Sequence, residues 1–261
     1  REDMLLPLDF ENIPNYELVD DTFKNQAYDP DNMYSVPYTW GTVGIIYNTK
    51  YVDEADVGGW DLLWNEKYAD RIVMIDNSRD AFAIAEAMLG YSLNTEDPDE
   101  LQAAAELLAE QTAVVQSYSM DDMYNVMENE EAWIAPYYAG DAMLMMDENP
   151  DLAFYLPEDQ TFNVFIDAMC IPSCAEHKEE AELFINFLTS PEISGGNMDY
   201  IGYGTPVSAA KEYMDPEMAN NPVAYPDDAT LERGEAFVAL SDEAQQLMDN
   251  LFNEVKAGLT A

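Results

Sequence analysis

The sequence predicts an α/β fold, and two observations lead to this prediction. Short apolar runs with strand character alternate along the chain with segments in which apolar residues recur at helical spacing. Residues that commonly cap helices stand at the ends of several of those segments. Strands that alternate with helices are typical of α/β units with a mostly parallel sheet, so we expect that architecture here.

Four runs are predicted strands because they are rich in Val, Ile, Phe and Tyr, which favour a pleated and half-buried surface. They are GTVGIIYN (41–48), RIVMID (71–76), AWIAPYY (132–138) and NVFIDAMCI (163–171). Pro172 ends the last of them.

Three segments are predicted helices. Asp97 is suited to cap the first, with Pro98 in its first position and Glu100 in its first turn. The second has apolar residues at helical spacing and ends before Pro191: Ala181, Phe184, Ile185 and Leu188. The third lies between a Ser241 cap and Gly258, with the apolar positions Ala244, Leu247, Met248, Leu251, Phe252 and Val255. We interpret the acidic run DDMYNVMENEE (121–131) as a solvated helix face.

Charge limits the classes of partner. The 261 residues include 53 acidic and 10 basic side chains, which gives a net charge of -43. A nucleic-acid partner is therefore not expected, because contacts to phosphates need Lys and Arg. A cationic partner fits this charge, although an acidic surface can also serve solubility alone. No apolar run approaches the roughly 20 residues that a membrane-spanning helix needs.

Metal-ligating and nucleophilic residues are scarce. Cys170 and Cys174 are four positions apart and His177 is the one histidine, too few for a structural zinc centre or a Ser-His-Asp triad. A disulfide between the two cysteines is conceivable, but we interpret them as separate small apolar residues. His177 is expected to be solvated in the first turn of a helix. We expect no cofactor and no resident metal.

Carboxylates follow or end three of the predicted strands. Asn77 and Asp80 follow the strand at 71–76, Asp141 follows Tyr138 at the end of 132–138, and Asp167 lies within 163–171. In open α/β sheets, ligands bind at the carboxyl ends of strands, so these side chains are candidates for one site.

Each of these acids also has a structural alternative. Asp80 could complement the positive end of a helix dipole, Asp141 could cap the helix after Gly140, and Asp167 could hydrogen-bond to the backbone. Asp167 is the strongest candidate for function, since a carboxylate in an apolar strand needs either water or a cationic partner.

Aromatic residues accompany the acids, and this combination favours an organic ammonium ligand. Tyr138, Phe165 and Tyr203 could each face a cation and also contact its methylene groups. A carboxylate would orient the ammonium through charge-assisted hydrogen bonds.

Two other functions fit parts of the sequence. Asp80 and Asp141 could be the carboxylate pair of a glycosidase-like hydrolase. The acidic stretch DPDN (29–32) could hold a hard cation such as calcium, although it lacks the spacing of a known calcium loop.

Several segments resemble the spermidine/putrescine-binding proteins of bacterial ABC importers, in the same order and over nearly the whole chain. They are DPDNMYSVPYTWGTVGIIYN, WDLLWNEKYADRIVMIDNSRDAF, LGYSLNTEDPDE, IDAMCIPSCAEHKEEAELFINFLTSPE and IGYGTPVSAAK. The resemblance implies a two-lobed, hinged periplasmic-binding-protein fold of type II. It also implies a protein that is not an enzyme, that binds a polyamine in the periplasm or outside the cell, as a secreted or lipid-anchored protein, and that presents it to a membrane permease as a monomer.

The resemblance also assigns site residues. The aromatic-x-acid pattern that grips an amine matches Phe165 and Asp167, which implies that Asp167 faces a polyamine. The pattern Tyr138-Ala-Gly-Asp141 matches putrescine-preferring members, with Tyr in place of Trp, and the tyrosine of the IGY motif is Tyr203.

Two further positions follow the strand at 71–76. Asn77 and Asp80 match the family's acid or amide and the acid three residues later. Spermidine-selective members carry an acid where this chain has Asn77, so the resemblance does not indicate a preference for spermidine.

The resemblance implies the arrangement of the lobes. The first lobe is expected to contain residues 1–45 and 167–211, and the second to contain 46–166 and 212–261. Family members carry a signal peptide and opening strands for which this sequence has no match, so we expect an incomplete first lobe with exposed apolar surface. The opening residues 1–21 are expected to form a connecting loop and a short helix.

Overall fold

The computed structural model describes residues 4–258 of the chain. Two units can be distinguished: unit 1 comprises Arg1–Gly41 and Phe165–Tyr225, and unit 2 comprises Thr42–Val164 and Pro226–Ala261. The chain therefore passes between the units three times. The lobe boundaries expected from the sequence, after residues 45, 166 and 211, lie close to the first two of these passages and before the third.

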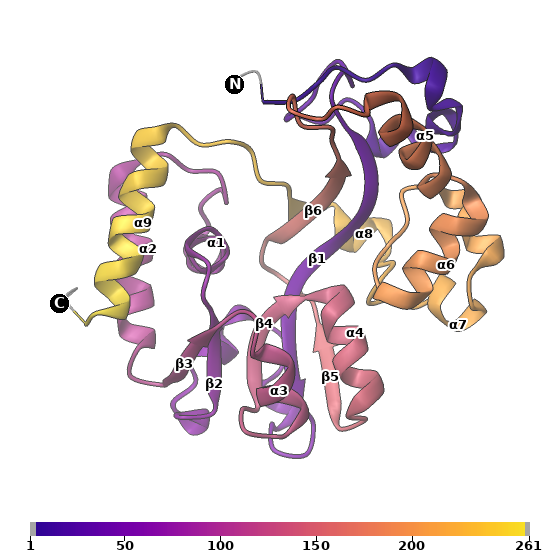
Figure 1. The fold of residues 1–261 in the computed structure, drawn as a ribbon. Coiled ribbons are helices and arrows are strands. Elements are labelled where there is room, and N and C mark those ends of the chain that lie inside the picture. Colours follow the sequence, from indigo (N-terminus) through magenta and orange to yellow (C-terminus); the bar gives the residue numbers. More distant parts are fainter. Residues whose placement is uncertain (1–3, 259–261) are drawn as a thin grey trace. The chain divides into compact units, whose positions relative to one another are not determined.

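Seven strands are present in the described part of the chain (Figure 1). Their bounds are β1 Val36–Asn48, β2 Ile72–Ile75, β3 Val115–Ser119, β4 Ile134–Tyr138, β5 Leu152–Tyr155, β6 Phe162–Met169 and β7 Gly234–Glu235. The four predicted strands are confirmed as β1, β2, β4 and β6. β3, β5 and β7 were not predicted.

Nine α-helices accompany these strands in residues 4–258. They are α1 Ser78–Leu89, α2 Pro98–Gln111, α3 Met123–Glu128, α4 Ala139–Glu148, α5 Lys178–Leu188, α6 Pro191–Ile201, α7 Pro216–Ala219, α8 Asp228–Leu231 and α9 Asp242–Lys256. Short 3-10 helices lie at Phe10–Asn12, Pro14–Leu18, Asp21–Phe23, Glu54–Asp56, Trp60–Trp64, Glu66–Tyr68 and Ser208–Tyr213.

The expected caps form. The carboxylate of Asp97 accepts from the N–H of Asp99 at 2.9 Å, and the hydroxyl of Ser241 accepts from the N–H of Ala244 at 3.2 Å. Each bond satisfies an N–H group that the first turn of a helix leaves without an internal partner. The predictions for the starts of α2 and α9 are therefore confirmed.

The strands of unit 2 pair in both directions. β2 runs parallel to β3 and to β4, whereas β1 runs antiparallel to β4 and to β5. The strands around β2 are parallel, as expected for a mostly parallel sheet, and β1 is an antiparallel exception. The reason is topological. The chain crosses from β4 to β5 through α4, and β1 pairs with both of these strands and runs in the opposite direction.

The core of unit 2 combines β2 with the helices that follow it. Each residue of β2 is buried, and α1, α2 and α9 pack against one another, with α2 and α9 side by side in Figure 1. The largest buried side chains include Trp60 and Phe82. Close packing of these groups holds the carboxyl end of β2 in place.

Unit 1 is held together between its opening segment and α5. The carboxylate of Glu182, which is 1% exposed, accepts from the N–H of Asp9 and from the amide of Asn12, each at 2.8 Å, and pairs with Lys178 at 2.6 Å. A small apolar cluster lies alongside: Ile13, Val36, Ile171 and Ile185. Residues 4–21 form the expected connecting segment with short 3-10 helices, while residues 1–3 of that prediction lie outside the described residues.

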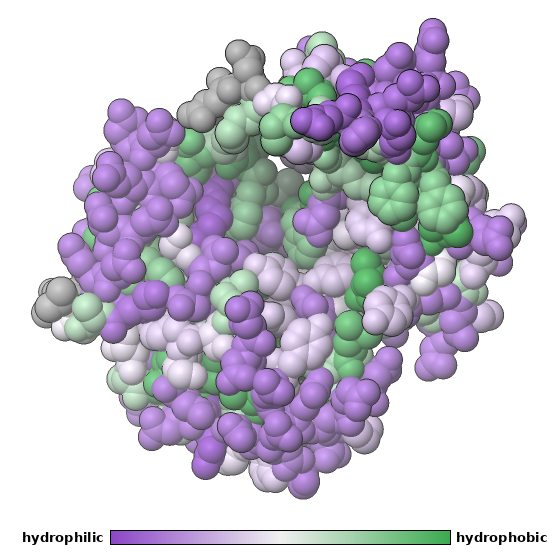
Figure 2. Space-filling view, viewed as in Figure 1, coloured by the Kyte–Doolittle hydropathy of each residue, from purple (hydrophilic) through white to green (hydrophobic). Residues whose placement is uncertain are grey.

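Most exposed large apolar side chains of the described residues belong to unit 1. The exceptions are Leu89 and Val238 in unit 2. On α5, Phe184 and Phe187 are 59% and 51% exposed and stack on each other. Elsewhere, the face in Figure 2 is largely hydrophilic, in keeping with the excess of acidic residues.

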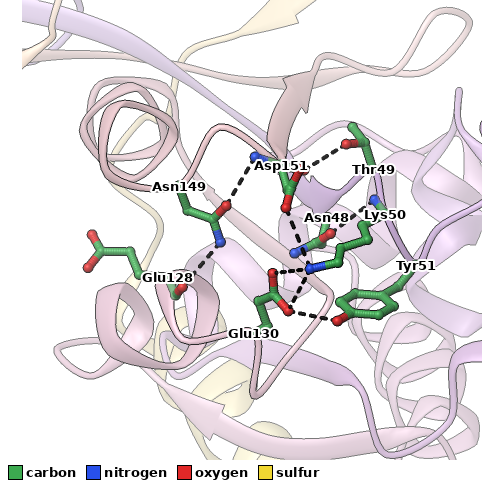
Figure 3. A network of polar contacts seen from close by, with 8 residues as sticks. All are labelled: Asn48, Thr49, Lys50, Tyr51, Glu128, Glu130, Asn149 and Asp151. Atoms are coloured by element: carbon green, nitrogen blue, oxygen red, sulfur yellow. Dashed lines mark hydrogen bonds and ion pairs between the residues drawn. The ribbon is translucent and has the colours of Figure 1, made fainter.

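One polar network lies where β1 ends and β4 begins. Lys50 lies 3.1 Å from a carboxylate oxygen of Glu130 and 3.7 Å from Asp151, and the hydroxyl of Tyr51 donates to Glu130 at 2.7 Å (Figure 3). Because β1 and β4 are antiparallel, this network lies at the end of β4 opposite to Tyr138. It joins three turns of unit 2 and lies apart from the candidate site described next.

Candidate functional site

Unit 2 brings the carboxyl ends of β2, β3 and β4 to one edge of its sheet. The three strands are parallel, with Ile75 opposite Ser119 and Ile72 opposite Ile134. The segments that carry the predicted site residues leave from this edge, α1 after β2 and α4 after β4. The prediction that ligand-binding groups follow these strand ends relies on this geometry.

Asn77 is the N-cap of α1. Its side-chain oxygen accepts from the N–H of Asp80 at 3.2 Å. The amide therefore has a structural task at the helix start, and Asp80 lies in the first turn, where a negative charge complements the helix dipole. This position agrees with the alternative that Asp80 complements the positive end of the helix dipole. That role is compatible with a role in binding.

Asp80 is bonded to Tyr138. The hydroxyl of Tyr138 donates to a carboxylate oxygen of Asp80 at 2.8 Å, which connects the turn after β2 with the turn after β4. Asp80 is 6% exposed. Burial raises the pKa of its carboxyl group, while the hydrogen bond from Tyr138 and the charge of Arg79 act in the opposite direction.

Asp141 lies in the first turn of α4, whose N-cap residue is Tyr138. Tyr138 makes no side-chain cap bond, and Asp141 accepts a hydrogen bond from the hydroxyl of Tyr124 in α3. Burial and this bond, in that order, raise the pKa of Tyr124 well above its ordinary value, so its hydroxyl remains a donor at neutral pH.

Tyrosine rings surround the two acids. Tyr137 lies 5.2 Å from Tyr138 and 6.4 Å from Tyr124 between ring centroids, and its hydroxyl donates to the carbonyl of Met120 at 3.0 Å. Burial, with the nearby charges of Asp141 and Asp121, raises the pKa of Tyr137 to about 12. Neutral aromatic faces and ionisable carboxylates thus lie together, as an organic cation requires.

Tyr124 and Tyr137 were missed by sequence reasoning. Tyr124 lies in the run 121–131 that was interpreted as a solvated helix face, but Met123 and Met127 are buried and orient α3. The signal in the sequence was that Tyr124 directly follows an apolar residue, Met123, within an acidic run. That signal is weak without knowledge of the partner helix.

Phe165 and Tyr203 meet in unit 1, with ring centroids 6.0 Å apart and the rings nearly edge to face. Gly41 lies beneath both: a Cβ atom there would come within 2.9 Å of Phe165 and 3.0 Å of Tyr203. Trp40 positions this glycine, because its backbone exchanges two hydrogen bonds of 3.0 Å with Gly204. Glycine at position 41 therefore allows the two rings to approach the strand.

Asp167 lies on β6 and its side chain is exposed. The strand position predicted from the sequence is confirmed, and the carboxylate is not buried within the apolar strand. Its charge is one of several that, after burial and Asp29, raise the pKa of Tyr28 to about 12.

The seven predicted residues form two groups. In unit 2, the carboxylate of Asp80 is bonded to Tyr138, the side chain of Asn77 accepts from the backbone N–H of Asp80, and Asp141 lies one turn after Tyr138. In unit 1, Phe165 contacts Tyr203, and Asp167 lies two positions along the same strand.

The two alternative functions gain nothing from the geometry. Asp80 and Asp141 each accept from a tyrosine hydroxyl. Asp29, in the stretch considered for calcium, accepts from the N–H groups of Met33, Tyr34 and Ser35, each at 2.9 Å, so its oxygens organise the loop. Among residues 4–258, no group of three or more His, Cys, Asp or Glu side chains is arranged to hold a metal ion.

Three remaining features can be placed. Cys170 and Cys174 are both free and exposed, which agrees with separate cysteines, although neither is buried. His177 precedes α5 as its N-cap residue, and its side chain is 80% exposed. Within the part of the chain that the structure describes, no helix is long and apolar enough to cross a membrane.

Comparison with known proteins identifies the family. Residues 1–233 match the family model described as bacterial extracellular solute-binding protein. The spermidine/putrescine-binding periplasmic protein of Salmonella typhimurium is 32% identical over 258 residues, which are 99% of this chain and 74% of that protein. The Escherichia coli K12 protein of the same name is 31% identical over the same shares of both chains.

Solved structures agree with the sequence comparison. The spermidine/putrescine ABC transporter substrate-binding protein PotD of Streptococcus pneumoniae superposes with a TM-score of 0.88 and 34% identity, covering 99% of this chain and 79% of that one. These matches bear out the periplasmic-binding-protein-like fold, and none of them supports the hydrolase alternative. The family is one of binding proteins and not of enzymes. The chain belongs to the bacterial extracellular solute-binding proteins.

Proposed function

We propose that this chain captures a polyamine, putrescine or spermidine, for import by an ABC transporter. The observation that carries the proposal is the pairing of Asp80 with Tyr138 at the sheet edge that also bears Asp141. Relatives named for binding spermidine and putrescine support it.

The chemistry of the residues suits an ammonium ligand. An ionised carboxylate and an ammonium form charge-assisted hydrogen bonds, which are about twice as strong as neutral ones. A cation over an aromatic face gains roughly 0.5 to 2 kcal/mol, depending on how far it is removed from water. Asp80 and Asp141 would bind an ammonium group, and the ring of Tyr138 would contact its methylene groups.

The predicted residues of unit 1 would act in the same way. Asp167 would pair with an ammonium group, while Phe165 and Tyr203 would contact the carbon chain of the polyamine. Asn77 would contribute its amide group in place of an acid. The net charge of -43 favours the approach of a cation over that of an anion.

The cellular context is part of the proposal. The chain would act in the periplasm or on the outer face of the cell membrane, as a monomer that delivers its ligand to a membrane permease. No chemical step and no cofactor are involved, and nucleic acid is not a partner.

Calorimetric titration of the chain with putrescine, spermidine and lysine tests this function. We expect saturable binding of at least one polyamine and no binding of lysine, because the carboxylate of lysine would meet acidic side chains. Absence of heat with both polyamines would overturn the proposal.

A further inference from the structure

Two helices of unit 2 are joined by a bond between a tyrosine and an acid. Tyr124 of α3 donates its hydroxyl hydrogen to Oδ1 of Asp141 in the first turn of α4, and α3 and α4 pack against each other. Tyr124 belongs to none of the motifs from which the site was predicted.

The local packing fixes the Tyr124 side chain. Met123 and Met127, on either side of it in α3, are fully buried, and the ring of Tyr124 meets the edge of Tyr137 at a centroid distance of 6.4 Å. A side chain held in this way loses little additional freedom when it makes a hydrogen bond. Its hydroxyl is therefore a fixed donor that defines where Oδ1 of Asp141 lies.

A carboxylate offers about four acceptor positions on its two oxygens. The hydrogen bond from Tyr124 takes one of these positions and orients the carboxylate of Asp141. The pair resembles Tyr138 and Asp80 at the same sheet edge, where a tyrosine hydroxyl also donates to a carboxylate.

We propose that Tyr124 is a positioning residue for polyamine binding, which acts by holding the Asp141 carboxylate in the orientation that accepts an ammonium group. This inference rests on the proposed function. Without the hydroxyl, binding would have to immobilise the Asp141 side chain, and we expect affinity to fall by about three- to tenfold.

A double-mutant cycle tests this role by calorimetric titration with putrescine and spermidine. The variants are Tyr124→Phe, Asp141→Asn and the two combined. Tyr124→Phe removes the hydroxyl and keeps the ring against Tyr137. We expect the substitution to weaken binding about three- to tenfold in the unmodified chain and less than twofold when Asp141 is already Asn.

Tyr51→Phe is the matched control. Tyr51 donates to Glu130 at 2.7 Å, the same kind of bond, at the opposite end of β4 (Figure 3). We expect this variant to bind polyamines with unchanged affinity. Circular dichroism of each variant verifies that the fold is retained.

The possible outcomes distinguish a wrong role for Tyr124 from a wrong proposed function. Binding by the unmodified chain together with equal binding by Tyr124→Phe overturns the role of Tyr124 alone. An equal loss in the Asp141→Asn background also overturns it, because the effect would not pass through Asp141. Absence of polyamine binding by the unmodified chain overturns the proposed function and this inference together.

Discussion

The hydroxyl of Tyr138 donates a hydrogen bond of 2.8 Å to the carboxylate of Asp80. The two residues are 58 positions apart in the sequence and meet because β2 and β4 are parallel neighbours. A tryptophan at position 138, as in putrescine-preferring members of the family, would supply an aromatic face without a hydroxyl. The tyrosine therefore joins an aromatic ring of the candidate site to one of its acids through a hydrogen bond.

Asp80→Asn is expected to weaken polyamine binding about 10- to 100-fold, since a hydrogen bond to a charged group is worth roughly 1.5 to 3 kcal/mol. Asn keeps the size of the side chain and can still accept from Tyr138, so the fold should persist. Calorimetric titration measures the change. Asp151→Asn, in the network of Figure 3, is the control and should bind normally. Unchanged affinity of Asp80→Asn would remove Asp80 from the site.

Asn77 allows the cap and the ligand contact to be separated. Asp caps helices about as well as Asn, so Asn77→Asp should keep α1 stable and add a charge where spermidine-selective family members carry an acid. We expect it to raise the affinity for spermidine relative to putrescine several-fold. Asn77→Ala should instead lower the free energy of unfolding by about 1 kcal/mol. An unaltered ratio of the two affinities in Asn77→Asp would show that position 77 does not select the ligand.

Glu86 of α1 is expected to make stability depend on pH. It is fully buried, neither carboxyl oxygen has a hydrogen-bond partner among the described residues, and burial raises its pKa to about 8. The nearby charge of Arg79 opposes this increase, and those of Glu235 and Glu100 add to it.

The sign follows from proton binding. The folded chain binds this proton more tightly than the unfolded chain, in which the group has its ordinary pKa of 4.5. The stabilisation is therefore complete below pH 4.5 and is lost as the pH rises to about 8, by up to about 1.4 kcal/mol per pH unit.

Urea unfolding between pH 5 and pH 8 measures this effect. Glu86→Gln should flatten the pH dependence and raise the midpoint at pH 8, whereas Glu110→Gln, at an exposed position of α2, should follow the unmodified chain. The unmodified chain and both variants contain Asp80, so its contribution to the pH dependence is the same in each and does not affect the comparison. Parallel curves for Glu86→Gln and the unmodified chain would contradict a raised pKa at Glu86.

The net charge of -43 predicts salt-dependent stability. Repulsion among exposed acids opposes the compact state, and salt screens it as the Debye length falls from about 10 Å at 0.1 M to about 3 Å at 1 M. We expect the melting temperature to rise as NaCl is increased over this range, and to rise equally with KCl. A melting temperature that is independent of salt would show that the acids do not destabilise the folded chain.

Much of the fold was predictable from local signals. The Asp97 and Ser241 caps act within one helical turn. The apolar runs that form β1, β2, β4 and β6 could be recognised from their composition. The acids of the candidate site were proposed for a related reason, since each lies within a strand or within five residues of the end of one. The antiparallel direction of β1 was not predicted, because the composition of an apolar run does not indicate whether its neighbours run parallel or antiparallel to it.

The sequence by itself determined four of the strands and three of the longer helices, the acidity of the surface and the family to which the chain is similar, because propensity, capping and charge act over a few residues. Only the tertiary structure decided that Tyr138 bonds to Asp80, that Tyr124 bonds to Asp141 and that the carboxyl group of Glu86 is buried without a hydrogen-bond partner among residues 4–258. Those relationships depend on strand order and helix packing, which bring together residues that are distant along the chain.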